Sequence, residues 1–228
     1  MIHPIEFNPD STASNPGGLA LSERKLRVLE PSMSGWRRVV RKVIGMLLIV
    51  EVLDMIDRKV LSEHLAKGDA RAAVVVSTAP LLVAAYSDDL ECVAMLRFPA
   101  KFVDQYSLRL GSQLVTVNTY YSQFTNHADL TFGPGHVDDW SGFFPLIAEF
   151  LSDDSFRIEY LKEDIDKTEW DRCRQLGEAY LLERPRVARL GRPRRAHQPA
   201  GFMKKIVIGV SVSVVAMVAF IVVAWKFL

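Results

Sequence analysis

The feature that most constrains this chain is an uncharged apolar stretch near its end, residues 206–225, IVIGVSVSVVAMVAFIVVAW. A helix rises about 1.5 Å per residue, so the stretch covers roughly the 30 Å hydrocarbon core of a bilayer. Twelve of its residues are Ile, Val or Phe, and at about −0.3 to −0.6 kcal/mol each they contribute roughly −4 to −7 kcal/mol to insertion. We therefore expect a transmembrane helix. A buried strand or core helix in a soluble domain is the alternative, but it leaves the bracketing residues Lys204, Lys205 and Lys226 unexplained.

Basic residues flank this stretch unequally. Those before it are Arg184, Arg186, Arg189, Arg192, Arg194, Arg195, Lys204 and Lys205. Only Lys226 follows it. The positive-inside rule then places the N-terminal domain in the cytoplasm and predicts a single-pass, C-terminally anchored protein that inserts after synthesis. Residues 184–205 contain proline and glycine, so we expect an extended stalk whose basic side chains contact anionic headgroups; a topology signal alone is the other interpretation, and both can hold.

The charge of the chain is divided between its two parts. There are 28 basic and 27 acidic residues, and from residue 184 onward there are nine basic residues and no acidic ones, which leaves residues 1–183 with a net charge of −8. An acidic body on a basic stalk argues against nucleic-acid binding, which needs positive charge on a folded face. The chain has no Asn-X-Ser/Thr acceptor site, and residues 1–18 have no secretory-signal pattern, both of which fit a cytoplasmic domain.

Hydrophobic periodicity predicts an α+β domain over residues 25–183, with a mainly antiparallel sheet, after a disordered arm of residues 1–24. Predicted strands cover 25–30, 72–77, 81–86, 92–97, 113–121 and 156–161, with a hairpin loop at 87–91. Predicted helices cover 34–67, 99–108, 141–151 and 166–182. Asp166 and Glu169 have the spacing of a capping box at the start of the last helix. Cys92 and Cys173 give no disulfide framework, and we expect them to be buried thiols.

The long predicted helix at 34–67 begins with a basic cluster. Its apolar middle, residues 43–50, extends only about 12 Å, too short for a second span, and is typical of a helix buried against other elements. The cluster comprises Trp36, Arg37, Arg38, Arg41 and Lys42. Cations are unfavourable at a helix N-terminus unless an anion lies near. The acidic stretch at 149–171 is one candidate anion, and the anionic inner leaflet is the other, which Trp36 favours.

One loop carries residues of metal-ligand type. Two imidazoles and three carboxylates lie within thirteen residues: His127, Asp129, His136, Asp138 and Asp139. Divalent metals such as zinc take these ligands. There is no third imidazole nearby, and aspartate is an ordinary turn residue, so a solvated loop is the simpler interpretation. The chain has no P-loop, GxGxxG, GxSxG or HExxH motif, so no cofactor is predicted.

These observations give three hypotheses about function. The first is a non-enzymatic membrane protein that presents a cytoplasmic α+β domain to a partner or ligand. The second is a membrane-anchored, metal-dependent hydrolase that uses the loop from His127 to Asp139. The third is a structural oligomer that associates through Gly209 and Ser213, a small-xxx-small pair in the predicted anchor.

Overall fold

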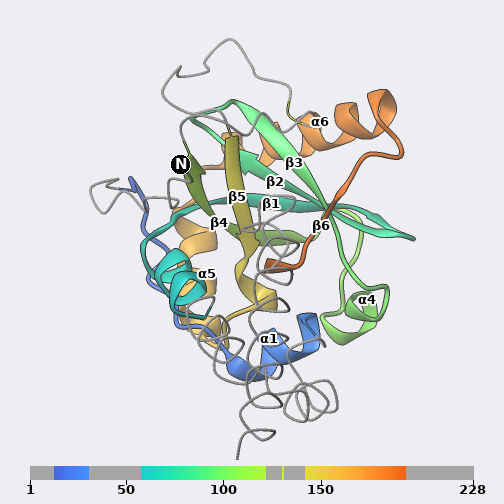
Figure 1. Ribbon diagram of the computed structural model, residues 1–228. Coiled ribbons are helices and arrows are strands. Elements are labelled where there is room, and N and C mark those ends of the chain that lie inside the picture. The colour runs from blue at the N-terminus through green and yellow to red at the C-terminus, as the bar shows by residue number, and fades with distance from the viewer. Residues whose placement is uncertain (1–12, 31–57, 122–129, 131–141, 194–228) are drawn as a thin grey trace, which may run out of the picture. The chain divides into compact units, whose positions relative to one another are not determined.

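The computed structural model describes residues 13–30, 58–121, 130 and 142–193 (Figure 1). The helices are α1 (Glu23–Leu29), α4 (Lys101–Gln105), α5 (Ser155–Asp164) and α6 (Lys167–Glu183), with a short 3-10 helix η2 (Ala148–Phe150). The strands are β1 (Asp69–Thr78), β2 (Leu81–Ser87), β3 (Cys92–Arg97), β4 (Gln113–Tyr121), β5 (Gly142–Ile147) and β6 (Arg189–Leu190). Residues 58–67 are also helical.

The strands form one sheet in the order β5-β4-β1-β2-β3-β6. Four of its neighbouring pairs are antiparallel, and β3 pairs with β6 in parallel. The predicted hairpin is confirmed, because β2 and β3 pair from Leu82↔Arg97 to Ser87↔Cys92. The predicted α+β class, with a mainly antiparallel sheet, agrees with this arrangement of helices around a mixed, curled sheet.

Helix α6 covers one face of the sheet, and a glycine sets how closely it packs. A Cβ added at Gly177 would lie 2.7 Å from the Ala84 Cβ and 2.9 Å from the Val76 Cγ1. The missing side chain therefore lets α6 rest directly on β1 and β2. Cys173, one turn earlier, is buried and its Sγ lies 3.4 Å from the Ala84 carbonyl oxygen. Both cysteines are free and buried, as expected.

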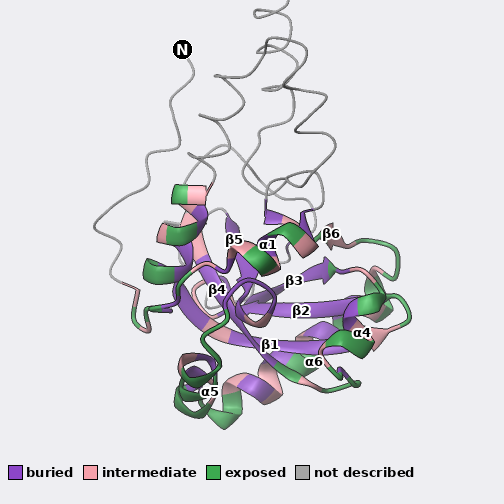
Figure 2. Ribbon diagram, turned by 90° about the horizontal axis from the view of Figure 1, so that it is seen from below, coloured by how far each residue is buried: buried purple, intermediate pink, exposed green. Residues whose placement is uncertain are grey.

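The sheet curls so that a side chain of β6 reaches the backbone of β5, although the two strands do not pair. Arg189 in β6 donates a hydrogen bond of 3.0 Å from Nη1 to the carbonyl oxygen of Phe143 in β5. Inside the curl lies a small apolar cluster of Leu90, Cys92, Ala94, Leu130 and Phe143. Figure 2 shows the central strands buried along their length, whereas α5 exposes its outer surface.

Two predicted strands are wrong, because both segments are helical. Residues 25–30 lie in or just after α1, which Ser22 caps by accepting from the Lys25 N–H. Residues 156–161 lie in α5, which Asp154 caps by accepting from the Arg157 N–H. Such caps satisfy backbone donors that the first turn of a helix leaves unpaired.

The predicted helix at 141–151 is also wrong over most of its length. Its residues form β5, which pairs with β4 from Thr116↔Ile147 to Tyr121↔Gly142, followed by η2. Pro145 fits this strand because β5 has only one strand neighbour, and an edge strand tolerates a residue without an N–H donor.

Residues 13–24 belong to the folded domain and not to the predicted disordered arm. Leu19 is 2% exposed, and the Gly17 N–H donates to the Gly68 carbonyl at 2.9 Å. Arg157 secures the segment further, donating to the carbonyl oxygens of Pro16 at 2.8 Å and Gly17 at 3.0 Å. We call residues 14–19 the N-terminal strap, since they lie across the end of helix 58–67 and the start of β1.

Two parts of the predicted architecture lie outside the described residues. The long helix at 34–67 is described only over 58–67, where Gly68 follows it as predicted and donates to the His64 carbonyl. The apolar stretch 206–225 is not described. Among the helices that are described, none combines the length and apolar character needed to cross a bilayer.

Candidate functional site

Most residues predicted to carry function lie outside the described part of the chain. These are His127, Asp129, His136, Asp138, Asp139, Trp36, Arg37, Arg38, Arg41, Lys42, Arg194, Arg195, Lys204 and Lys205. Arg184, Arg186, Arg189 and Arg192 are described, and Arg189 bridges the outer strands as noted above. The described segments contain no group of three or more His, Cys, Asp or Glu side chains placed to hold a metal ion.

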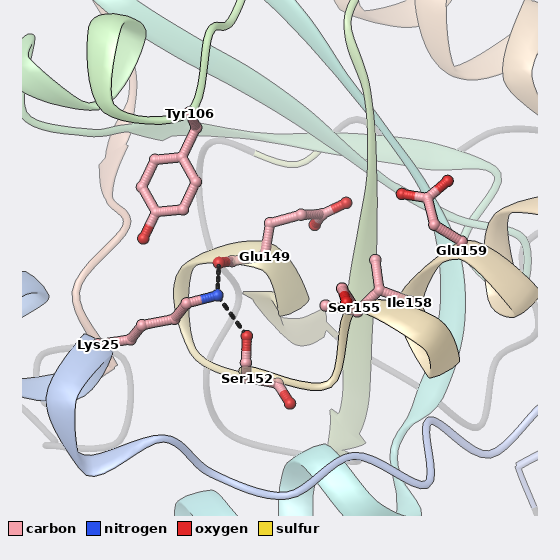
Figure 3. A pocket seen from close by; sticks show the side chains of 7 residues that line it. All are labelled: Lys25, Tyr106, Glu149, Ser152, Ser155, Ile158 and Glu159. Atoms are coloured by element: carbon pink, nitrogen blue, oxygen red, sulfur yellow. Dashed lines mark hydrogen bonds between the residues drawn. The ribbon is translucent and has the colours of Figure 1, made fainter.

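A pocket of about 130 Å³ opens beside α5 (Figure 3). It draws its walls from segments far apart in sequence: α1, the end of α4, η2 and α5. The lining residues are Lys25, Tyr106, Glu149, Ser152, Ser155, Ile158 and Glu159. Ligand sites for drug-sized molecules usually enclose about 300–1,000 Å³, so this pocket has the size of one amino-acid side chain.

Lys25 fixes one wall of the pocket. Its Nζ donates to the carbonyl oxygens of Glu149 at 2.9 Å and Ser152 at 2.5 Å, as Figure 3 shows. It also lies 3.6 Å from Asp153 Oδ1. Glu149 lies in η2, and Ser152 follows the end of η2 by two residues. The Lys25 ammonium therefore ties α1 to η2.

Glu149 and Lys162 form a partly buried ion pair behind the pocket. Their side chains are 13% and 20% exposed, and Lys162 Nζ lies 3.1 Å from Glu149 Oε1. The Val115 N–H also donates to Glu149, at 3.1 Å to Oε2. Burial raises the pKa of Glu149, and the nearby Lys162 partly offsets that shift. The carboxylate thus links α5 to β4 and already has its hydrogen-bond partners.

Next to the pocket, α5 carries two aromatic side chains that are exposed to solvent. Phe156 is 84% exposed and Tyr160, one turn later, is 51% exposed. The guanidinium carbon of Arg157 lies 5.1 Å from the centre of the Tyr160 ring, a cation–π distance. We call Phe156, Arg157 and Tyr160 the aromatic ridge. Glu159 lines the pocket. It follows Phe156 by three residues, so the two are neighbours on the surface of α5.

A second charged cluster surrounds Arg71, whose side chain is 15% exposed. Its guanidinium contacts three carboxylates: Asp69 at 2.6 Å, Asp88 at 2.6 Å and Glu169 at 3.5 Å. It also donates to Ser14 Oγ of the N-terminal strap at 2.6 Å. We call these four charged residues the Arg71 cluster.

The register of the sheet explains why this cluster exists. Strand β1 pairs with β4 from Asp69 onward but with β2 only from Ala73 onward. The first residues of β1 therefore lack a strand on one side. Glu169 supplies the missing acceptor, since the Ala72 N–H donates to its Oε1 at 2.7 Å. The capping-box role predicted for Glu169 is wrong, although Asp166 does cap α6 by accepting from the Thr168 N–H. The cluster joins the strap, the sheet and α6, which is a structural role.

Sequence reasoning missed the pocket and the aromatic ridge. The ridge had one usable signal, an aromatic pair four residues apart after a capping aspartate, Asp154. The pocket had none, because its lining residues come from four separate segments. No protein family, curated protein or solved structure matches this chain.

Proposed function

We propose that this chain is a membrane-anchored binding protein whose folded domain presents the aromatic ridge and the adjoining pocket to a protein partner. The anchoring part of the proposal is supported by the length, composition and flanking charges of residues 206–225. The binding part is supported chiefly by one observation, the 84% exposure of Phe156 on a helix that also borders a pocket.

The ridge has the composition that binding surfaces favour. Burying a Phe or Tyr side chain removes a large apolar area from water, and aromatic residues and arginine are enriched among residues that dominate binding energy. Leaving Phe156 exposed costs the free domain about 1.5–3 kcal/mol compared with burying it. A partner that covers Phe156 recovers part of that free energy.

The pocket suits the same kind of partner. Its size admits one side chain from a partner and excludes a nucleotide or other large cofactor. Its polar groups Glu159, Ser155 and Tyr106 favour a side chain with hydrogen-bond donors. The net charge of −8 over residues 1–183 favours a partner with a basic surface.

A photo-crosslinking amino acid at position 156 of the full chain, in its native membrane, tests the binding part. We expect a discrete crosslinked product whose yield falls when Tyr160→Ala is added. The control position is 110, because Leu110 is 73% exposed and lies in the turn before β4, outside α5. Equal crosslinking from both positions, or none from position 156, would refute the binding proposal.

The anchor is tested by two charged substitutions in the full chain. Val215→Arg with Met217→Arg adds about 5–7 kcal/mol to the cost of insertion, which is comparable to the whole favourable term from the apolar residues. We expect this variant to be released from membranes by alkaline carbonate, whereas the matched variant Val215→Leu with Met217→Leu remains. Retention of the arginine variant would show that another segment holds the chain at the membrane.

A further inference from the structure

Residues 182–192, from the last turn of α6 through β6, combine exposed apolar side chains with arginines. Leu182 is 85% exposed, Leu190 is 45% exposed and Val187 is 44% exposed. Four arginines lie among or just after them: Arg184, Arg186, Arg189 and Arg192. Glu183 is the acidic residue in residues 182–193. Within the described residues, the exposed Arg186 makes no ion pair.

This segment is held in the fold at both ends. Helix α6 ends at Glu183, and the Arg184 N–H donates to the Tyr180 carbonyl at 2.8 Å. At the other end, β6 pairs in parallel with β3, and the Gly191 N–H donates to the Arg97 carbonyl at 3.0 Å. A Cβ at Gly191 would lie 2.3 Å from the Phe98 ring, so the chain passes very close to the core there. The exposed side chains therefore sit on a fixed backbone.

This segment lies close in sequence to the proposed anchor. Twelve residues lie between residue 193 and residue 206, so a fully extended chain spans at most about 45 Å from one to the other. Residues 182–192 are thus among the described residues closest in sequence to the proposed anchor.

We propose that residues 182–192 dock on an anionic lipid surface, with Arg184, Arg186 and Arg192 at the headgroups and Leu182 inserted among the acyl chains near them, while Arg189 keeps its hydrogen bond to Phe143. This inference rests on the proposed anchor and adds that the domain has one preferred orientation on the membrane. Leucine at a helix end beside basic residues is suited to the interface, where apolar burial and headgroup attraction act together. Each basic residue at an anionic surface strengthens association roughly fivefold.

The orientation has a consequence for the aromatic ridge. Helix α6 has 17 residues, so it is about 25 Å long. Its first residue follows α5 closely in the chain, whereas Leu182 lies at its far end, and Figure 1 shows the end of α6 at the upper right, apart from α5 at the lower left. Docking through the end of α6 therefore keeps Phe156 away from the lipid and available to a partner in solution.

The test uses the full chain in vesicles, with an environment-sensitive fluorophore on Leu182→Cys. Cys92 and Cys173 are 3% and 0% exposed, so the introduced thiol is labelled selectively in the folded protein. We expect blue-shifted emission in phosphatidylcholine vesicles that contain phosphatidylserine, and water-like emission in phosphatidylcholine alone. A label on Phe156→Cys should report water in both.

Charge substitutions sharpen the test. Arg184→Gln with Arg186→Gln should weaken docking roughly 25-fold, from about fivefold per arginine. Arg27→Gln with Arg174→Gln changes the net charge equally at exposed positions elsewhere and should leave the Leu182 signal unchanged. A water-like signal at position 182 in carbonate-resistant, inserted protein would overturn the docking while leaving the anchor intact. A blue shift that depends on protein density and not on lipid charge would show that residues 182–192 contact another copy of the chain. That result would overturn the proposed docking on lipid. If the protein fails to insert into the vesicles, both the proposed anchor and the proposed docking are refuted.

Discussion

Replacing Arg71 with methionine is the most informative perturbation of the fold. The substitution keeps most of the side-chain volume but removes the charge that three carboxylates share. The Asp69 side chain is 6% exposed and would lose its partner at 2.6 Å. Leaving one member of a buried ion pair unpaired costs about 3–5 kcal/mol. Asp88, whose side chain is 37% exposed, adds little because solvent screens it.

We expect Arg71→Met to lower the free energy of unfolding by about 3–5 kcal/mol at pH 7. The measurement is urea unfolding of the full chain in mild detergent, followed by tryptophan fluorescence, since Trp170 is buried in α6. The matched control is Asp69→Asn with Arg71→Met, which removes both charges and should recover part of the loss. The two substitutions should therefore couple by about 1–3 kcal/mol. Additive effects, with coupling below about 0.5 kcal/mol, would refute the idea that Arg71 stabilises the fold through Asp69.

The pH dependence gives an independent check. Burial raises the pKa of Asp69 above its ordinary value of 3.8, even beside Arg71, and burial also raises the pKa of Glu169 above 4.5. A carboxyl whose pKa is higher in the folded state destabilises the fold when ionised, and that penalty is relieved as the pH falls through the folded pKa. Without Arg71 the pKa of Asp69 should rise further. Arg71→Met should therefore regain stability relative to the parent chain between neutral and mildly acidic pH, and a constant difference would contradict this.

Three further predictions concern the helices and the metal hypothesis. Gly177→Ala should destabilise the domain by up to about 2 kcal/mol, because overpacking against Ala84 costs about 1–3 kcal/mol and the gain in helix propensity returns about 1 kcal/mol; adding Ala84→Gly should restore stability in the same unfolding assay. Lys162→Met should cost about 3 kcal/mol by leaving Glu149 unpaired, and adding Glu149→Gln should reduce that loss, whereas an undiminished loss would contradict the role of the pair. Added zinc or manganese should leave the melting temperature unchanged; a rise would support the hydrolase hypothesis for the loop from His127 to Asp139.

The central strands could be predicted because their sequence patterns are typical of strands and of no other element. β1 to β4 are rich in β-branched and apolar residues, and a short polar loop between β2 and β3 predicts the hairpin. Helix α6 is long enough for its period to be clear, and Asp166 marks its start. In these segments the local pattern and the tertiary environment agree.

The predictions for α5 and β5 are wrong, and each error has a physical reason. In α5, Phe156, Ile158 and Tyr160 alternate like a half-buried strand, yet the buried residues are Ile158 and Leu161, three apart as in a helix. The exposed aromatic pair produced the false alternation. In β5 two phenylalanines and Pro145 gave an apolar run whose length suited either element, and pairing with β4 decided the outcome.

The candidate site lies beyond what local patterns determine. Glu169 had the spacing of a capping residue, but the unpaired Ala72 N–H and the Arg71 guanidinium provide stronger partners in the folded chain. The pocket depends on Lys25 and Glu149 meeting across 124 positions of sequence. Contacts of this range follow from the sheet topology, which the sequence pattern alone did not specify.

The hydrogen bond from Arg189 in β6 to β5 also bears on contacts between copies of this protein. Backbone groups at the rim of a sheet can recruit a strand from a neighbouring molecule, which leads to edge-to-edge aggregation. Here β6 lies along β3, and the Arg189 side chain occupies the Phe143 carbonyl of β5. Arg189 therefore leaves one acceptor fewer on the outer strand β5 for a neighbouring copy to pair with.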